Sequence, residues 1–185
     1  MKKIGFIGAY DKTDLLIYIA KLLVENDVKV LIVDATTLQK TRYTVPCIMP
    51  SRKYITTYED MDIAIGFENL QEIMNYAGTQ DFNYDIMLLD IDNRKAFEDF
   101  EMYTSDKNYF VTAFDNYSIK KGLETVGQSE EKMLMTKILF SKNMDRDEDE
   151  YLNFLSFYYA VKWSKEKIYF PFEAGDSSVI VQNQR

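Results

Sequence analysis

The chain has 185 residues, of which 46% are hydrophobic and 28% are charged, so the composition indicates a globular protein with a sizeable core rather than a disordered chain. The net charge of −8 argues against broad nucleic-acid binding, which needs clustered Lys and Arg, and the lack of His excludes His-based catalysis and His-containing metal sites. Aromatic residues make up 15% of the chain, which favours an aromatic core or a Tyr-rich protein-binding surface.

Cysteine content and hydropathy bear on the compartment. The single Cys47 excludes an intramolecular disulfide and a Cys-based zinc site, and we expect it to be a half-buried strand residue. No apolar run is long enough to span a membrane, and the first residues enter a strand without a signal peptide. We therefore expect a cytoplasmic protein without direct membrane insertion.

The first 34 residues predict a strand, a tight turn, a helix and a second strand that ends on Asp34. In order, these elements cover residues 2–8, 8–13, 14–26 and 28–34. A phosphate-binding loop needs small residues, so that backbone N–H groups approach phosphate, and a Lys and a hydroxyl at the helix start. The turn has Gly8, Lys12 and Thr13 in these roles, but Asp11 stands where a glycine would precede the Lys.

After Asp34 the chain continues to alternate strand-like and helical patterns. Extended segments are expected at residues 43–48, Tyr54–Tyr58, 61–67, 84–90, 109–115, Met133–Phe140 and 167–172. Helices are expected at residues 69–77, 117–126 and 147–160, and a short acidic helix or loop at 93–102. Apolar strands separated by helices predict an α/β fold: a three-layer, mostly parallel twisted sheet with helices on both faces, in one domain over residues 1–185. Its central strands should be residues 4–8, 30–34, 87–90 and 110–114.

In this order, the motifs resemble those of the MinD/ParA-type P-loop ATPases, a class of NTPases that dimerise. The family's loop reads Lys-Gly-Gly-x-Gly-Lys-Thr-Thr, and the aligned stretch here reads Ile-Gly-Ala-Tyr-Asp-Lys-Thr-Asp. Gly8, Lys12 and Thr13 match it, whereas Ile7 replaces the signature Lys that reaches the partner's nucleotide across the dimer. The resemblance covers most of the chain and implies a P-loop NTPase-like fold.

The resemblance also implies where ATP and magnesium would bind. The loop residues around the phosphates would be Gly8, Ala9, Asp11, Lys12 and Thr13. Asp34 matches an acid that helps to activate water or hold magnesium, and Asp90 matches the Walker B acid, so Thr13 and Asp90 would hold the ion. Ser141 falls near the family's adenine-reading Asn, and Pro171 lies in a segment similar to the family's Pro-acid segment.

Two departures from the family pattern argue against efficient ATP hydrolysis. A carboxylate at Asp11 within ~4 Å of a triphosphate repels it by several kcal/mol at an effective dielectric near 20, and Ile7 removes the contribution in trans. Lys12 is then free to form a structural ion pair with Asp11, Asp34 or Asp90. We therefore expect no required cofactor, although ATP with magnesium stays a candidate ligand if the metal bridges to phosphate or Asp11 turns outward.

Each matching residue also has a purely structural interpretation. Lys12 would be a surface lysine in the first helical turn, Thr13 or Asp11 a helix cap, and Asp34 and Asp90 ordinary strand ends. Singly, these interpretations are the stronger ones. Together, in this order, the residues favour descent from the nucleotide-binding fold. Whether the chain has the activity of that fold is a separate question.

Three functions remain in competition. The leading hypothesis is a non-catalytic or weakly nucleotide-binding MinD/ParA-like protein that acts as a scaffold or regulator in a bacterial localisation, pilus or secretion assembly. Its expected partners are proteins, including those of a membrane-associated assembly, and not nucleic acid. The alternative is an active divergent ATPase that cycles between monomer and dimer. The third is a receiver-like or flavodoxin-like domain with magnesium at Asp34, Asp90 and Asp92, which is disfavoured because the Lys-Thr turn follows the first strand.

Two aromatic segments are candidate partner contacts. One is Tyr54–Tyr58, and the other is the Phe-Tyr-Tyr sequence at residues 157–159 of the predicted late helix, where core packing is the stronger interpretation. A homodimer is expected to avoid the nucleotide face, because its acids would meet their own copies across a two-fold axis.

Overall fold

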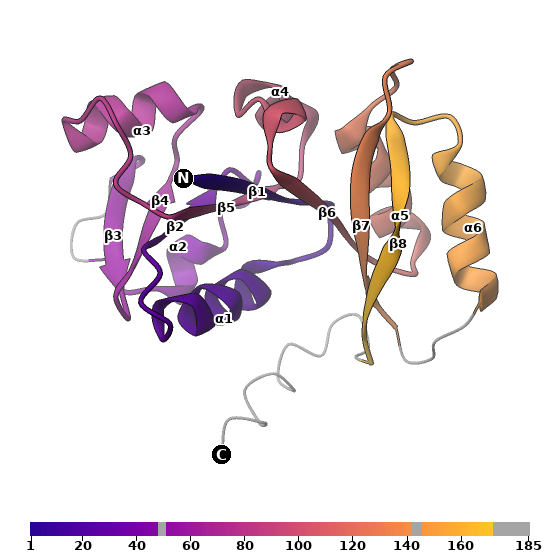
Figure 1. Ribbon diagram of the computed structural model, residues 1–185, viewed down its shortest axis with the longest axis horizontal. Helices are drawn as coiled ribbons and strands as arrows, with labels where there is room; N and C mark the ends of the chain where they lie inside the picture. The colour runs from indigo at the N-terminus through magenta and orange to yellow at the C-terminus, as the bar shows by residue number, and fades with distance from the viewer. Residues whose placement is uncertain (48–50, 142–145, 172–185) are drawn as a thin grey trace.

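The computed structural model describes residues 1–47, 51–141 and 146–171, and these form a layered α/β architecture around one eight-stranded sheet (Figure 1). The strands are β1 (Lys2–Ile7), β2 (Val30–Asp34), β3 (Tyr54–Tyr58), β4 (Met61–Ile65), β5 (Ile86–Ile91), β6 (Lys107–Ala113), β7 (Met133–Phe140) and β8 (Val161–Phe170). The helices are α1 (Thr13–Val24), α2 (Thr41–Thr44), α3 (Leu70–Ala77), α4 (Arg94–Asp99), the 3-10 turn η1 (Met102–Thr104), α5 (Asn116–Val126) and α6 (Arg146–Ser156).

The strand order is β3-β4-β2-β5-β1-β6-β7-β8, and only the β3–β4 pair is antiparallel among the described strands. The four strands expected at the centre, β2, β5, β1 and β6, are adjacent in the middle of the sheet, which confirms that prediction. Every residue of β2 is buried, as expected for a parallel strand covered on both faces.

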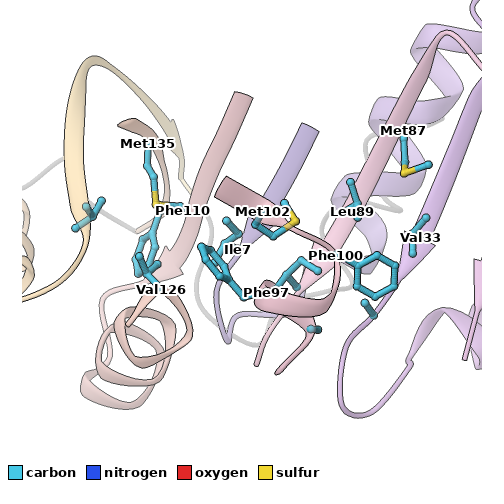
Figure 2. Packing of buried hydrophobic residues seen from close by; sticks show 14 of the residues in the cluster. Ile7, Val33, Met87, Leu89, Phe97, Phe100, Met102, Phe110, Val126 and Met135 are labelled. Atoms are coloured by element: carbon cyan, nitrogen blue, oxygen red, sulfur yellow. The ribbon is translucent and has the colours of Figure 1, made fainter. Parts of the chain in front are cut away.

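Helices cover both faces of the sheet, so the predicted three-layer α/β fold is confirmed. On one face α1 buries Leu16 and Ala20 against strand residues such as Ile32. The opposite face is covered by α3, α4, α5 and α6, which contribute buried apolar side chains to a second cluster. Figure 2 shows part of this cluster, with Phe97 and Phe100 beside the strand residues that they cover.

Two segments differ from the sequence-based expectation. Part of residues 43–48, expected to be extended, lies in the helical turn α2, which starts where the Thr41 N–H donates to Asp34 Oδ2 at 3.2 Å. The late helix ends at Ser156 instead of residue 160, and β8 begins at Val161, six residues before the expected start. The β8 sequence hides its strand pattern because it is an edge strand rich in exposed charged side chains.

The parallel register determines where the candidate site forms. Asp34 lies opposite Asp90 on neighbouring strands, and Ile7 lies opposite Ile91. The carboxyl ends of β1, β2 and β5 therefore meet at one edge of the sheet, where open α/β sheets bind their ligands. None of the helices in the described part of the chain has the length and apolarity needed to cross a membrane.

Candidate functional site

The loop between β1 and α1 turns at Gly8, a position that only glycine fits. Its φ is 148°, and an added Cβ would lie 2.1 Å from the carbonyl oxygen of Val111. The Gly8 N–H donates to Ile91 O at 3.0 Å, which ties the loop to β5. The N–H groups of residues 9–12 donate no hydrogen bond to any residue that the structure describes, so they are available to an external acceptor.

Lys12 is buried at the bottom of this loop, with 1% of its surface exposed. Its ammonium donates to Gly8 O at 2.6 Å and to Tyr10 O at 3.1 Å, and it forms an ion pair with Asp90 Oδ1 at 2.9 Å. Two of its three protons are therefore taken by backbone oxygens, whereas the contact with Asp90 Oδ1 is an ion pair without hydrogen-bond geometry. Of the three acids considered as partners from the sequence, the structure therefore selects Asp90.

Asp90 is itself buried, at the carboxyl end of β5. Burial raises the pKa of its carboxyl group to about 7, because desolvation disfavours the charged form. The Lys12 ammonium acts in the opposite direction, and the carboxylate of Asp34 adds to the increase. Both protonation states of Asp90 are therefore populated near neutral pH.

Asp11 pairs with Lys40 and not with Lys12, and it is half exposed, with 46% of its side chain accessible. Its Oδ2 pairs with the ammonium of Lys40 at 2.9 Å, and its Oδ1 accepts a hydrogen bond from the Thr13 N–H at 3.1 Å. Burial raises the pKa of Asp11, but the hydrogen bonds from Lys40 and Thr13 outweigh this effect and hold it below its usual value. The carboxylate is thus charged at neutral pH, and Lys40 offsets part of that charge.

Asp34 stabilises the segment that carries Lys40. It is buried and accepts hydrogen bonds from Thr36 Oγ1 at 2.6 Å, from Thr36 N at 3.0 Å and from Thr41 N at 3.2 Å. It does not line the cavity beside the loop. In this arrangement Asp34 acts as a turn and helix cap, and the role in water activation implied by the family resemblance stays a prediction.

A small cavity lies between the loop and the segment after β2, with a volume of about 70 Å³. It is lined by Ala9, Tyr10, Asp11, Lys12, Thr13, Thr36, Leu38, Lys40, Asp90 and Asp92. Binding sites for organic ligands are typically about 300–1,000 Å³. A nucleotide would therefore require the Asp11–Lys40 contact and its segment to move.

The two residues predicted to hold magnesium, Thr13 and Asp90, do come together in this cavity. However, an oxygen of Asp90 is already engaged by the Lys12 ammonium. Within residues 1–47, 51–141 and 146–171, no group of three or more acidic or Cys side chains is arranged to hold a metal ion. Magnesium held by Thr13 and Asp90 together with a bound nucleotide stays a prediction.

Ser141 and Pro171 lie at the carboxyl ends of β7 and β8 and do not line the cavity. The Ser141 N–H donates to Phe170 O at 3.0 Å, which places the two strand ends side by side. Next to them the ring of Tyr10 stacks on Phe140 at 4.6 Å between centroids, and Phe140 stacks on Phe170 at 5.0 Å. This stack anchors the loop to the strand ends.

Sequence reasoning missed Lys40 and the aromatic stack. Lys40 is one lysine in a polar stretch with no motif around it, and the rings of the stack come from three distant segments. Only the tertiary structure brings these groups to the loop.

The two aromatic segments that are candidate partner contacts differ in how exposed their side chains are. Tyr54 is buried, whereas the other aromatic residue of this segment, Tyr58, is partly exposed on the edge strand β3. Phe157 and Tyr158 follow the end of α6 and are exposed, so the expected core packing is wrong for both, while Tyr159 is half-buried.

Solved structures of a cell division protein, a plasmid partition protein and a ParA-family ATPase are similar to this chain. A ParA-family ATPase from Chlorobium tepidum matches with a TM-score of 0.57 and 14% identity, over 100% of this chain and 93% of that one. A plasmid partition protein from Borrelia burgdorferi matches with a TM-score of 0.56 and 12% identity, over 98% and 95%. The MinD cell division protein of Aquifex aeolicus matches with a TM-score of 0.52 and 14% identity, over 94% and 83%. No protein-family model and no curated protein matches the sequence.

Proposed function

We propose that this chain, which has the fold of the MinD and ParA-family P-loop ATPases, is a non-catalytic or weakly nucleotide-binding protein of that type. It would act as a scaffold or regulator in a bacterial localisation, pilus or secretion assembly. The observation that supports this most directly is the state of Lys12. The ammonium donates to two backbone oxygens of the loop and is paired with the buried Asp90, so a phosphate would have to displace internal partners of Lys12.

A phosphate group would have to compete with these internal contacts. Separating Lys12 from Asp90 leaves a buried carboxylate without its counterion, which costs about 3–5 kcal/mol in comparable buried pairs. The entering phosphate also meets Asp11 at the rim and a cavity of only about 70 Å³. These costs favour weak binding and slow turnover over an efficient ATPase cycle.

An active divergent ATPase is the second candidate, and one observation favours it. The turn at Gly8 is intact, and the N–H groups of residues 9–12 donate to no described residue. Unpaired N–H groups before a helix start are the groups that bind phosphate in such loops. Displacement of Lys40 from Asp11 would then be the first step of opening the site.

The structural similarity supports the cellular setting, which is part of the proposal. The similar proteins act in cell division and plasmid partition, which are processes that position large assemblies. We assign this chain to the cytoplasm, as one domain with protein partners, where it binds no nucleic acid and does not insert into a membrane.

A titration with ATP and magnesium, measured by calorimetry, tests the proposal. We expect weak or undetectable binding and no hydrolysis by the wild-type chain, and Lys12→Ala should not alter either result. Lys2→Ala, which removes an exposed lysine at the opposite end of β1, is the matched control. Hydrolysis that Lys12→Ala abolishes and Lys2→Ala preserves would replace the scaffold proposal with the ATPase.

A further inference from the structure

The turn that follows α6 carries exposed aromatic side chains that the loop site does not use. Phe157 is 76% exposed and Tyr158 67%, and Phe154, within α6 itself, is 69% exposed. The turn precedes Val161, the first residue of β8, so it lies at the amino end of that strand and away from the loop, with α6 at the right of the molecule in Figure 1. Clustered exposed aromatic side chains are typical of protein interfaces.

The backbone beneath these side chains is firmly held. The Lys132 ammonium donates to Phe157 O at 3.1 Å and also to Tyr159 O. The Ala160 N–H donates to Gly127 O at 2.8 Å, which joins the turn to the end of α5. The exposed rings are therefore presented by a fixed turn, and a partner would lose little conformational entropy in binding them.

The inner side of α6 is fixed as well. The buried ammonium of Lys137 pairs with Asp149 and contacts Asn153 Oδ1 at 2.5 Å, and Lys167 of β8 pairs with the same Asp149. One turn later, Trp163 Nε1 donates to Ser156 Oγ at 2.9 Å. These contacts fix the helix that carries Phe154 against β7 and β8.

A groove of about 760 Å³ lies directly beside the protruding rings. Its walls include Phe157, Tyr158 and Val161, together with Glu130 and Lys162. Both charged residues are exposed, and neither forms an ion pair with another residue in the part of the chain that the structure describes. One surface patch thus combines protruding aromatic rings, a groove and charged side chains of both signs.

We propose that this patch, formed by Phe157, Tyr158, Val161, Glu130 and Lys162, is the contact surface for a second copy of this chain. A two-fold interface uses the same patch twice and therefore requires self-complementarity. Here the rings of each copy enter the groove of the other, and Glu130 of each copy faces Lys162 of the other. On the loop face, by contrast, Asp11 is already paired with Lys40 of the same chain, Asp90 is buried, and the ring of Tyr10 is stacked on Phe140. The inference goes beyond the proposed function, since the dimer needs no nucleotide.

Sedimentation equilibrium of the full chain without nucleotide, from low to high micromolar concentration, tests this inference. The wild-type chain should pass from monomer to dimer as concentration rises. Phe157→Ser and Tyr158→Ser should each raise the dimer dissociation constant roughly thirtyfold, which corresponds to ~2 kcal/mol at about 1.4 kcal/mol per tenfold change. Tyr43→Ser, at an aromatic residue of α2 that is 84% exposed, should leave the constant unchanged.

A charge exchange separates direct contact from an indirect structural effect. Glu130→Lys and Lys162→Glu should each weaken the dimer by placing like charges together, and the double variant should restore it, because every pair again has opposite signs. A chain that stays monomeric at every concentration overturns the proposal. A dimer that survives Phe157→Ser and ignores the charge exchange overturns it too, as does one that forms only with ATP and magnesium.

Discussion

The buried pair of Lys12 and Asp90 gives the sharpest test of how the loop is stabilised. Lys12→Met removes the ammonium and leaves the Asp90 carboxyl group buried without its counterion. When Asp90 is ionised, such a loss costs about 3–5 kcal/mol. Small domains have ~5–15 kcal/mol of total stability, so the effect is large enough to measure.

The contribution of Asp90 to the free energy of unfolding should depend on pH. The direction of this dependence follows from the raised pKa of the buried carboxyl group. Burial raises the folded-state pKa of Asp90 to about 7, whereas an unfolded Asp titrates near about 3.9. The stability due to this group is therefore fully present below about pH 4 and is lost as pH rises through 7. At about 1.36 kcal/mol per pH unit, the wild-type chain should lose roughly 2–3 kcal/mol from this group between pH 5 and 7.

In Lys12→Met the free energy of unfolding should fall more steeply as pH rises, and the fall should continue above pH 7. Lys12 lowers the pKa of Asp90, so its removal raises that pKa further. Lys12→Met should thus be close to wild type at pH 5 and least stable, relative to it, at pH 8.

Urea unfolding at these pH values, followed by the fluorescence of the single Trp163, measures the free energies directly. Asp90→Asn is the control, because an amide at this position has no charge to lose. The reasoning is refuted if Asp90→Asn shows the same decline between pH 5 and 7 as the wild-type chain.

Four further results are expected. Asp11→Gly should improve affinity for ATP with magnesium by at least about tenfold in calorimetry, because it removes the rim carboxylate and frees Lys40; unchanged affinity would mean that loop closure, and not charge, blocks the site. Its effect on stability should stay below ~1 kcal/mol, since the Asp11–Lys40 pair is half exposed. Gly8→Ala should abolish soluble folded protein, seen as loss of circular dichroism on purification, because its Cβ would overlap the carbonyl of Val111; a stable variant would show that the loop can turn differently. Light scattering should detect no dimer that forms on adding ATP with magnesium, and a dimer that Lys12→Ala removes would contradict both this result and the scaffold proposal.

Local sequence patterns were sufficient for the central part of the fold. The apolar runs that became β1, β2, β5 and β6 are buried on both faces, so hydrophobicity alone marks them. The edge strand β8 was placed six residues too late, because its exposed residues carry charges and do not alternate with apolar ones. The one-domain interpretation stays a prediction.

The sequence alone also determined which residues gather near the loop. Gly8, Lys12 and Thr13 lie within six residues of one another, and Asp34 and Asp90 end parallel strands, whose carboxyl ends must meet at one edge. Spacing and strand direction are local properties, and the sequence contains them directly.

Only the tertiary structure decided what these residues do there. Lys12 had three candidate partners, and it pairs with Asp90 where Asp34 accepts hydrogen bonds from Thr36 and Thr41 and Asp11 pairs with Lys40. Lys40 comes from another segment and pairs with Asp11, which no pattern in the sequence indicates. Pairing of charges depends on distance and desolvation, and both are set by segments that are far apart along the chain.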